Sequence, residues 1–407
     1  RLSRRRDLLA LAAAAALLFL PGLGRRDLWN PDEARYAVVA REMRERGDRL
    51  VPHLNGEVYS QKPPLFFWAI AAASLLTGGV DETSARLPSA LAAIGAVLLV
   101  YRLGERLFCR RAGWLAAAAF ATCAKVLWQG RFGQIDMLLV ALVTLGVWWW
   151  VRGWTEGRRG FYLLFFAATG LATLAKGPVG LLPPLLSVLA FLALTRQGAE
   201  ARRLGVGRGL LLWVAVVAAW LVPAGLAAGP EYLEQIVLRQ NVTRYADPWH
   251  HFQPWYYYLT VLPGDFFPWS FLLPMALLVG RREGWLRRRR AAGVEIDADQ
   301  ERRRLGFLFA LCWVVVTLLF FSLSSAKRTV YVLTMYPGLA LLVGAALDRA
   351  GAAWPRERRW LSWSFGALAA LCLLLAAAVP VVAERRAEEV AVLGGEPLVW
   401  KLVAALA

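Results

Sequence analysis

The segment "LLLWVAVVAAWLVPAGLAA" (210–228) runs for 19 residues without a charged side chain. About 20 apolar residues in an α-helix are enough to cross the hydrocarbon core of a bilayer. Similar runs recur along the chain, starting with "LLALAAAAALLFL" (8–20), and they are continuous rather than alternating with the period of two that is typical of a membrane β-barrel. The sequence therefore predicts an all-α polytopic membrane protein.

The composition of the 407-residue chain agrees with this fold class. Hydrophobic residues make up 58% of it, mean hydropathy is +0.46, and there are 19 tryptophans. The net charge of +18 comes from arginines clustered between apolar runs, which indicates membrane orientation rather than nucleic acid binding. The four cysteines show no CxxC spacing, and GxGxxG, Walker A and HExxH patterns are absent. Neither a zinc knuckle, a nucleotide-binding fold nor a zinc protease is indicated.

The basic loops decide the predicted topology, because arginine and lysine favour the cytoplasmic side of a membrane. If the apolar piece 63–79 does not cross, all five densely basic loops fall on the side of the Arg-rich N-terminus. We therefore expect a cytoplasmic N-terminus, a juxtamembrane helix at 63–79, and a long outer loop at 24–86. The eleven expected spans are 8–23, 87–103, 113–127, 137–151, 161–175, 178–195, 210–228, 255–279, 305–323, 329–347 and 360–380.

These spans form one expected transmembrane domain, residues 1–380, followed by a tail, residues 381–407. The first span is followed by "PGLGRRDLWNPDE" with no small-residue cleavage motif, so we expect it to be retained. The tail, which includes "PLVWKLVAALA", is expected to belong to a further helix or to a periplasmic portion.

Two adjacent carboxylates, Asp32 and Glu33, open the first outer loop in "LWNPDEARYAVVAREM" (28–43). The pattern predicts an amphipathic interfacial helix, with Asn30 as its N-cap and Pro31 as its first residue. One interpretation is a favourable interaction of either carboxylate with the helix dipole. The other is a general base, or a metal ligand, at the outer membrane surface. Both carboxylates are catalytic candidates, and Asp32 is the preferred one.

Lysine is rare, since only five of the 47 basic residues are lysines, yet Lys62, Lys125, Lys176 and Lys327 all fall at predicted outer ends. Lys62 precedes two prolines in "YSQKPPLFFW" (59–68), which fix the local backbone. Lys176 lies in a Lys-Gly-Pro turn that Gly and Pro would form without it. A single lysine at an interface can be explained by snorkelling. For Lys62 and Lys176 the alternative is binding of a lipid-linked phosphate, because a lysine near the headgroup plane suits such a group.

Asp136 lies where the chain re-enters the bilayer, in "WQGRFGQIDM" (128–137). A carboxylate at that depth is costly without a partner. Arg131 is close enough in sequence to be that partner, and the alternative is a buried role beside Asp32.

The segment "SLSSAKRTVYVLTMYP" (322–337) places Lys327 and Arg328 in a short outer loop, where positive charge is unexpected. With Lys62 they could bind a phosphate or pyrophosphate group. Tyr331, one helical turn further along, could donate a hydrogen bond to the same anion.

Two of the three histidines, His250 and His251, are adjacent in "NVTRYADPWHHFQPWYYY" (241–258). The surrounding aromatic residues are typical of a membrane-interface belt. Adjacent histidines rarely bind one ion together, which argues against a metal at this pair. A divalent metal is nevertheless left open as a cofactor.

Taken together, these motifs are similar to those of a known family. The segment "PDEARYAVVAREMRERGDRLVPHLNGEVYSQKPPLFFW" (31–68) closely resembles the first outer loop of the bacterial aminoarabinose transferases that act on lipid A. More broadly, the chain resembles the lipid-carrier-dependent glycosyltransferases with the GT-C fold, which include the protein O-mannosyltransferases. "RFGQIDMLL", "LAKGPVGLLPP" and "SSAKRTVYVLTMYP" follow in the family's order, and the first 180 residues match best.

The resemblance implies the GT-C fold and transfer of a sugar from a polyprenyl-phosphate carrier at the periplasmic membrane face. It implies that Asp32 is the catalytic base or site organiser and that Asp136 is the second acidic position. The residues that it places near the donor phosphate are Lys62, Tyr59, Lys327, Arg328 and Tyr331.

The chain departs from the family in two respects. Gln61 stands where the family commonly has Glu, which weakens any metal site that would use that position. The chain ends soon after the eleventh expected span, whereas the aminoarabinose transferases continue into further helices and a soluble domain. The acceptor is therefore left open as a lipid A-like lipid, a glycan or a protein.

The sequence thus predicts an inverting glycosyltransferase whose outer cavity binds a polyprenyl-phosphate-linked sugar donor. The alternative is a transporter or flippase that moves lipid-linked sugars without chemistry. That class would show ionisable residues within the spans and inverted repeats. The charges here gather at one face instead.

Overall fold

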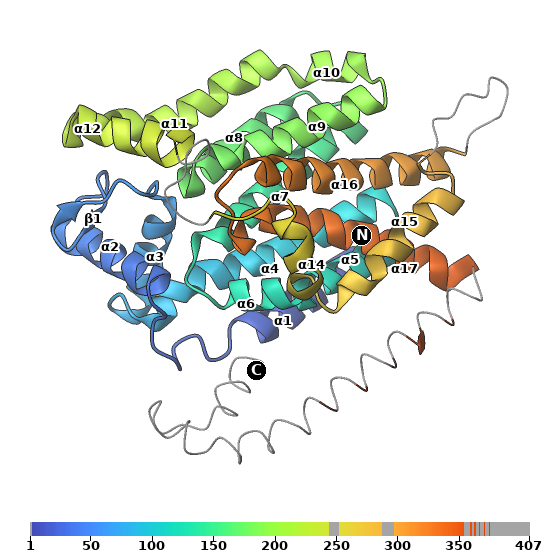
Figure 1. Cartoon of the computed structure of the whole chain (residues 1–407), viewed down its shortest axis with the longest axis horizontal. Helices are drawn as coiled ribbons and strands as arrows, with labels where there is room; N and C mark the ends of the chain where they lie inside the picture. The colour runs from blue at the N-terminus through green and yellow to red at the C-terminus, as the bar shows by residue number, and fades with distance from the viewer. Residues whose placement is uncertain are drawn as a thin grey trace. The chain divides into compact units, whose positions relative to one another are not determined.

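The computed structural model of the chain describes residues 2–243, 252–286 and 297–353, with a few isolated positions between 359 and 374 (Figure 1). Two compact units are present, Arg1–Ala346 and Leu347–Ala407. The described residues are mostly helical, as predicted, and their one small sheet pairs β1 (His53–Leu54) with β2 (Glu57–Val58). The expected span 360–380 and the tail lie outside the described elements.

The first unit is built around α4 (Glu82–Leu107), which contacts α1 (Leu2–Phe19), α5 (Arg110–Thr122) and α7 (Ile135–Glu156). Gly104 of α4 meets Gly113 of α5 so closely that a Cβ on the first would lie 2.6 Å from the Cα of the second. Small residues at such a contact let two helix backbones approach closely. This explains why Ala and Gly are so frequent in these helices.

A second row of helices covers α7. In Figure 1, α8 (Gly160–Lys176) lies between α7 and α11 (Val206–Ala228), and α16 (Ala298–Leu323) runs along α9 (Leu182–Leu194). Further helices are α6 (Ala124–Gly130), η1 (Pro178–Gly180), α10 (Gly198–Leu204), α12 (Pro230–Leu233), η2 (Glu234–Thr243), η4 (Thr329–Met335) and α17 (Tyr336–Ala353).

Five helical segments among the described residues are long and apolar enough to cross a membrane, and a sixth is added if one bent pair counts as a span. They are Glu82–Leu107, Ile135–Glu156, Gly198–Ala228, Ala298–Leu323 and Thr329–Ala350. Shorter apolar helices account for further expected spans. A multi-helix apolar architecture is therefore observed, and the number eleven stays a prediction.

Several expected spans have different ends in the structure. Helix α1 ends at Phe19 rather than at 23, because Pro21 and Gly22, the latter at φ +73°, cannot continue a helix. The expected span 113–127 is interrupted at Cys123, whose backbone is extended. Segment 178–195 likewise begins as the short helix η1 before α9 starts.

The prediction of one straight span at 255–279 is wrong. The segment forms α14 (Tyr257–Asp265), then η3 (Trp269–Phe271) and α15 (Leu272–Arg282), and the two halves are bent by 117°. The break falls in "LPGDFFPWS", where Pro263 and Pro268 each lack a backbone donor. The apolar composition concealed a break that the prolines indicate.

The first loop forms two helices, α2 (Asp32–Arg46) and α3 (Leu65–Thr77). The buried face of α2 carries apolar residues one turn apart, and it packs against aromatic residues of α3, as the predicted amphipathic helix requires. The packed residues are Tyr36, Val39, Ala40 and Met43 of α2 with Phe66, Phe67 and Ile70 of α3. Helix α3 has 13 residues, or about 20 Å, which is shorter than the bilayer core of about 30 Å.

The predicted N-cap role of Asn30 is wrong. Pro31 occupies the cap position, and no side chain caps the helix. The carboxylate of Glu33 instead accepts the N–H of Trp29 at 2.8 Å, ahead of the helix. Glu33 thus turns back toward the preceding loop.

A buried ion pair joins α2 to α4. Arg86 and Glu33 are both fully buried, and two guanidinium N–H groups donate to the two carboxylate oxygens, each at 2.8 Å. The remaining Arg86 donors reach the carbonyl oxygens of Leu23 (2.6 Å), Arg26 (2.8 Å) and Asp27 (2.8 Å). Bidentate geometry of this kind is the strongest that an arginine makes.

Glu33 is also held by the N–H of Gly133 at 2.6 Å, which links the start of α2 to the segment before α7. Burial alone would raise the pKa of Glu33, but Arg86 and the two backbone N–H groups outweigh it and lower the pKa. The carboxylate is therefore charged in the folded protein down to unusually acidic pH.

We expect Glu33→Gln to lower the free energy of unfolding by about 3 kcal/mol at pH 7, because it leaves Arg86 as an uncompensated buried charge. A lowered folded-state pKa contributes stability above the ordinary value of 4.5 that is lost as the pH falls below it. The melting temperatures of wild type and variant should therefore converge below pH 4.5. Glu45→Gln, an exposed change on the same helix, is the matched control. A variant as stable as this control at pH 7 would contradict the assignment.

Candidate active site

A cavity of about 110 Å³ lies where the starts of α2 and α7 meet the end of α8 and the segment joining α16 to η4. Its charged lining residues are Asp32, Lys62, Asp136, Lys176 and Arg328, and Tyr331 lines it as well. They come from distant parts of the chain, and Asp32 and Arg328 alone are 296 positions apart. The fold thus gathers six of the predicted site residues around one space.

Asp32 is held on two sides. Its Oδ2 accepts a hydrogen bond from the Gln134 side chain at 2.9 Å and lies 3.1 Å from the Arg328 guanidinium. Its side chain is 12% exposed, so the carboxylate is sheltered yet reachable from the cavity. It is adjacent to Glu33 in the first turn of α2, but Asp32 lines the cavity while Glu33 binds Arg86.

Asp136, in the first turn of α7, is paired with Lys176 at the end of α8. The Lys176 ammonium also lies 4.9 Å from the centre of the Tyr331 ring, a cation–π distance. Arg131, the partner suggested by sequence proximity, donates instead to the carbonyl oxygens of Leu18 and Pro21. The interpretation of Arg131 as the partner is therefore wrong.

The cavity carries an excess of positive charge, because three cationic side chains face two carboxylates. Burial alone would lower the pKa of Arg328, but the neighbouring Asp32 outweighs it and raises that pKa above its ordinary value. Arg328 therefore stays charged. Burial, reinforced by Tyr59 and Asp32, raises the pKa of Tyr36 well above its ordinary value, so its hydroxyl stays protonated. The site is suited to an anionic ligand.

Three predicted site residues, Glu33, Tyr59 and Lys327, lie outside this cavity lining. Glu33 is fully buried against Arg86, with its carboxylate oxygens occupied by N–H donors, so the structure does not support the catalytic role expected for it. Tyr59 is 4% exposed and packs edge-on against Phe67, with ring centres 5.9 Å apart. Tyr59 belongs to the same buried cluster as Tyr36 and does not line the cavity itself.

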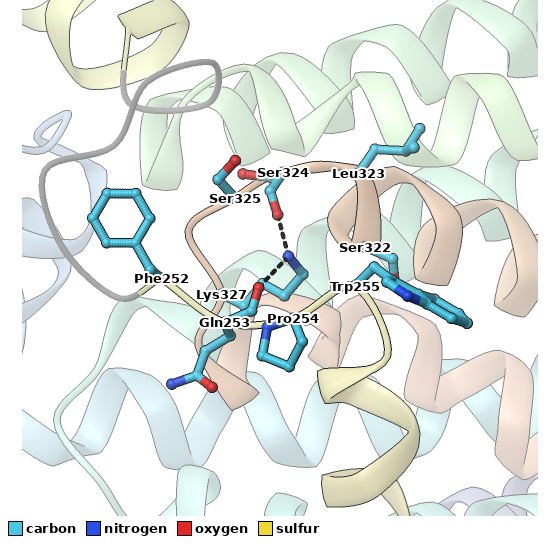
Figure 2. Close-up of a pocket in the computed structure, with 9 residues that line it drawn as sticks. All are labelled: Phe252, Gln253, Pro254, Trp255, Ser322, Leu323, Ser324, Ser325 and Lys327. Carbon is cyan, nitrogen blue, oxygen red and sulfur yellow. Dashed lines mark hydrogen bonds between the residues drawn. The ribbon is translucent and has the colours of Figure 1, made fainter.

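Lys327 also turns away from the cavity. It lines an open groove of about 550 Å³, and Figure 2 shows its ammonium between two backbone carbonyl oxygens, those of Gln253 (2.9 Å) and Ser324 (2.5 Å). Burial lowers the pKa of this lysine. Arg328 has an extended backbone, and neighbouring side chains of an extended chain point to opposite faces. The prediction that both cations face one anion is therefore wrong for Lys327.

Sequence reasoning missed three polar residues of the site. Gln134 binds Asp32, while Tyr36 and Gln240 line the cavity. Gln134 had a usable signal, since it lies two positions before Asp136 in the motif already singled out. Gln240 belongs to η2, and nothing in its sequence context marks it.

The described residues do not fit a divalent metal. No group of three or more His, Cys, Asp or Glu side chains lies together among them. The two carboxylates of the cavity are each paired with a cation. His250 and His251 lie outside the described residues.

Comparisons with known proteins show the family to which the chain belongs. Residues 61–222 match the profile of the family described as dolichyl-phosphate-mannose-protein mannosyltransferase. A transferase of Enterobacter sp. (strain 638), named undecaprenyl phosphate-alpha-4-amino-4-deoxy-L-arabinose arabinosyl transferase, is 30% identical over 97% of this chain and 70% of its own length. The chain belongs to the lipid-carrier-dependent GT-C glycosyltransferase family.

Two further proteins are similar to this chain over most of its length. The transferase of the same name from Pectobacterium carotovorum subsp. carotovorum (strain PC1) is 33% identical over 88% of this chain. The chain spans less than two thirds of that relative, 63% of its length. The crystal structure of ArnT from Cupriavidus metallidurans bound to undecaprenyl phosphate superposes with a TM-score of 0.77 at 27% identity, covering 92% of this chain and 65% of the other.

A more distant GT-C structure shows the same fold. The archaeal oligosaccharyltransferase AglB from Archaeoglobus fulgidus has a TM-score of 0.58 at 13% identity, over 90% of this chain and 54% of the other.

The adjacent residues Lys327 and Arg328 offer a direct test of the site's geometry. We expect Lys327→Met to lower the free energy of unfolding by about 2 kcal/mol, because two carbonyl oxygens lose their donor. Arg328→Met should cost less than half as much, since Gln134 still binds Asp32. Thermal unfolding in detergent measures both. Equal losses would contradict the assignment of Lys327 to structure and Arg328 to the cavity.

Proposed function

We propose that the chain transfers a sugar from a polyprenyl-phosphate carrier to an acceptor hydroxyl, with inversion at the sugar carbon. The observation that carries this proposal is the cavity in which Asp32 and Asp136 face Lys62, Lys176 and Arg328. Transfer of a sugar from a phosphate needs cations at the leaving group and a carboxylate near the acceptor. Membership of the GT-C family supports the same reaction class.

The cations would bind the donor phosphate. Arg328 presents a planar guanidinium suited to two phosphate oxygens, and Lys176 and Lys62 add compact charges beside it. Their positive charge stabilises the phosphate as the bond between its oxygen and the sugar carbon breaks. Tyr331, stacked on the Lys176 ammonium, fixes the direction of that ammonium.

Asp32 would act as the general base. The acceptor oxygen attacks the sugar carbon as the bond to the phosphate oxygen breaks, and the acceptor proton passes to the Asp32 carboxylate. The bonding electrons leave with the carrier phosphate. Asp136 holds Lys176 in place and adds negative charge near the electron-poor sugar carbon.

The ion pair between Asp32 and Arg328 explains how the proposed base is held before the donor binds. Without a donor, Asp32 shares the Arg328 guanidinium. A phosphate that enters the cavity competes for the same guanidinium, which weakens its hold on Asp32 and frees the carboxylate to accept a hydrogen bond from the acceptor. Binding of the donor therefore prepares the base for the acceptor.

The named relatives support undecaprenyl phosphate as the carrier and 4-amino-4-deoxy-L-arabinose as the sugar. The acceptor is of the lipid A-like, glycan or protein class. In this proposal the active face lies on the periplasmic side of the inner membrane. The chain crosses the membrane eleven times within residues 1–380, and residues 381–407 form a tail. In support, every segment lining the cavity falls at an end predicted to be outer.

Asp32→Asn should reduce transfer at least about 100-fold, because a positioned general base contributes that much or more. Purified protein with undecaprenyl phosphate-linked aminoarabinose and a lipid A acceptor provides the assay, with release of carrier phosphate as the readout. Asp27→Asn makes the same chemical change at an exposed position five residues earlier and should retain wild-type rates. Asp32→Asn at the rate of this control would exclude Asp32 as the base.

Arg328→Gln should weaken binding of undecaprenyl phosphate about tenfold, since a charge-assisted bidentate contact is lost. Binding is measured on the full chain in detergent micelles. The matched control is Arg41→Gln at an exposed position of α2, which should bind as the wild type does. Unchanged affinity in Arg328→Gln would remove Arg328 from the donor site.

A further inference from the structure

A second sheltered ion pair lies outside the cavity, where α6 meets the bend between α14 and α15. The Lys125 ammonium is 3.5 Å from an Asp265 carboxylate oxygen and donates to the hydroxyl of Thr329 at 2.6 Å. The side chains of Lys125 and Asp265 are 14% and 21% exposed. Asp265 is the last residue of α14, and Thr329 is the first residue of η4. One ammonium group therefore joins three elements.

The break between α5 and α6 makes this contact possible. In a continuous helix the N–H of Ala124 would bind the carbonyl four residues earlier. The extended backbone of Cys123 frees that N–H, which instead donates to the carbonyl of Phe267 at 2.8 Å. The Trp269 indole N–H adds a hydrogen bond to the hydroxyl of Thr122 at 3.0 Å. These two hydrogen bonds attach the break between α5 and α6 to the bend between α14 and α15.

Lys125 does more than attach α6 to the bend, because Ala124 and Thr122 already make that attachment. Its additional contact is with Thr329, which directly follows Arg328. The segment from Arg328 to Tyr331 contributes three cavity-lining residues, Arg328, Val330 and Tyr331. Fixing Thr329 fixes the start of η4 and, with it, the direction in which the Arg328 side chain leaves the backbone.

We propose that Lys125 is a positioning residue for the donor site, which acts through the Thr329 hydroxyl to hold Arg328 and Tyr331 in place. The inference rests on the proposed function, because it assigns Lys125 to the binding of the donor phosphate. Asp265 supplies the counter-charge that keeps the ammonium beside Thr329.

The test uses Thr329→Val, which keeps the shape of the side chain and removes the hydroxyl. Affinity for undecaprenyl phosphate should fall about fivefold, since the hydrogen bond to a charged group is lost. Lys125→Met should show a similar loss, and Thr329→Ser, which keeps the hydroxyl, should bind as the wild type does. Thr122→Val is the matched control, because it removes a contact at the same bend that does not reach η4. It should change affinity less than twofold.

A double-mutant cycle with Arg328→Gln separates positioning from general loosening of the fold. If Lys125 and Thr329 act through Arg328, Thr329→Val should have at most about a twofold effect in the Arg328→Gln background. A full fivefold effect there, or equal losses in Thr329→Val and Thr122→Val, would overturn the inference. A wild-type chain that binds no undecaprenyl phosphate would instead contradict the proposed function itself.

Discussion

The buried pair of Glu33 and Arg86 is the contact on which the site depends. It fastens the first residues of α2 to α4, and Gly133 joins the same carboxylate to the segment before α7. Asp32 directly precedes Glu33, so the ion pair between Glu33 and Arg86 also fixes the backbone position of Asp32. Its partner Gln134 is fixed in the same way, because it follows Gly133. The contacts of Glu33 thus fix both Asp32 and Gln134 at the edge of the cavity.

Sequence reasoning predicted the features that depend on composition and local pattern. The amphipathic face of α2, the break after Lys176 and the polar character of the first loop all follow from residue spacing and from Gly and Pro. It could not assign adjacent residues to different environments. Asp32 and Glu33 are chemically alike, as are Lys327 and Arg328, and in each pair only one member lines the cavity.

The pairing of charges was equally beyond local reasoning. Arg131 is five residues from Asp136 but binds carbonyl groups, while Lys176, 40 residues away, reaches the carboxylate. Which cation meets which carboxylate depends on how α7 and α8 pack. The bend between α14 and α15 is a different case, because Pro263 and Pro268 indicate a break within a segment whose apolar composition is typical of a single span.

Ser324 borders both the cavity and the open groove that contains Lys327. Ser324 therefore forms part of the wall of both spaces. A displacement of that wall toward one space shrinks that space and enlarges the other.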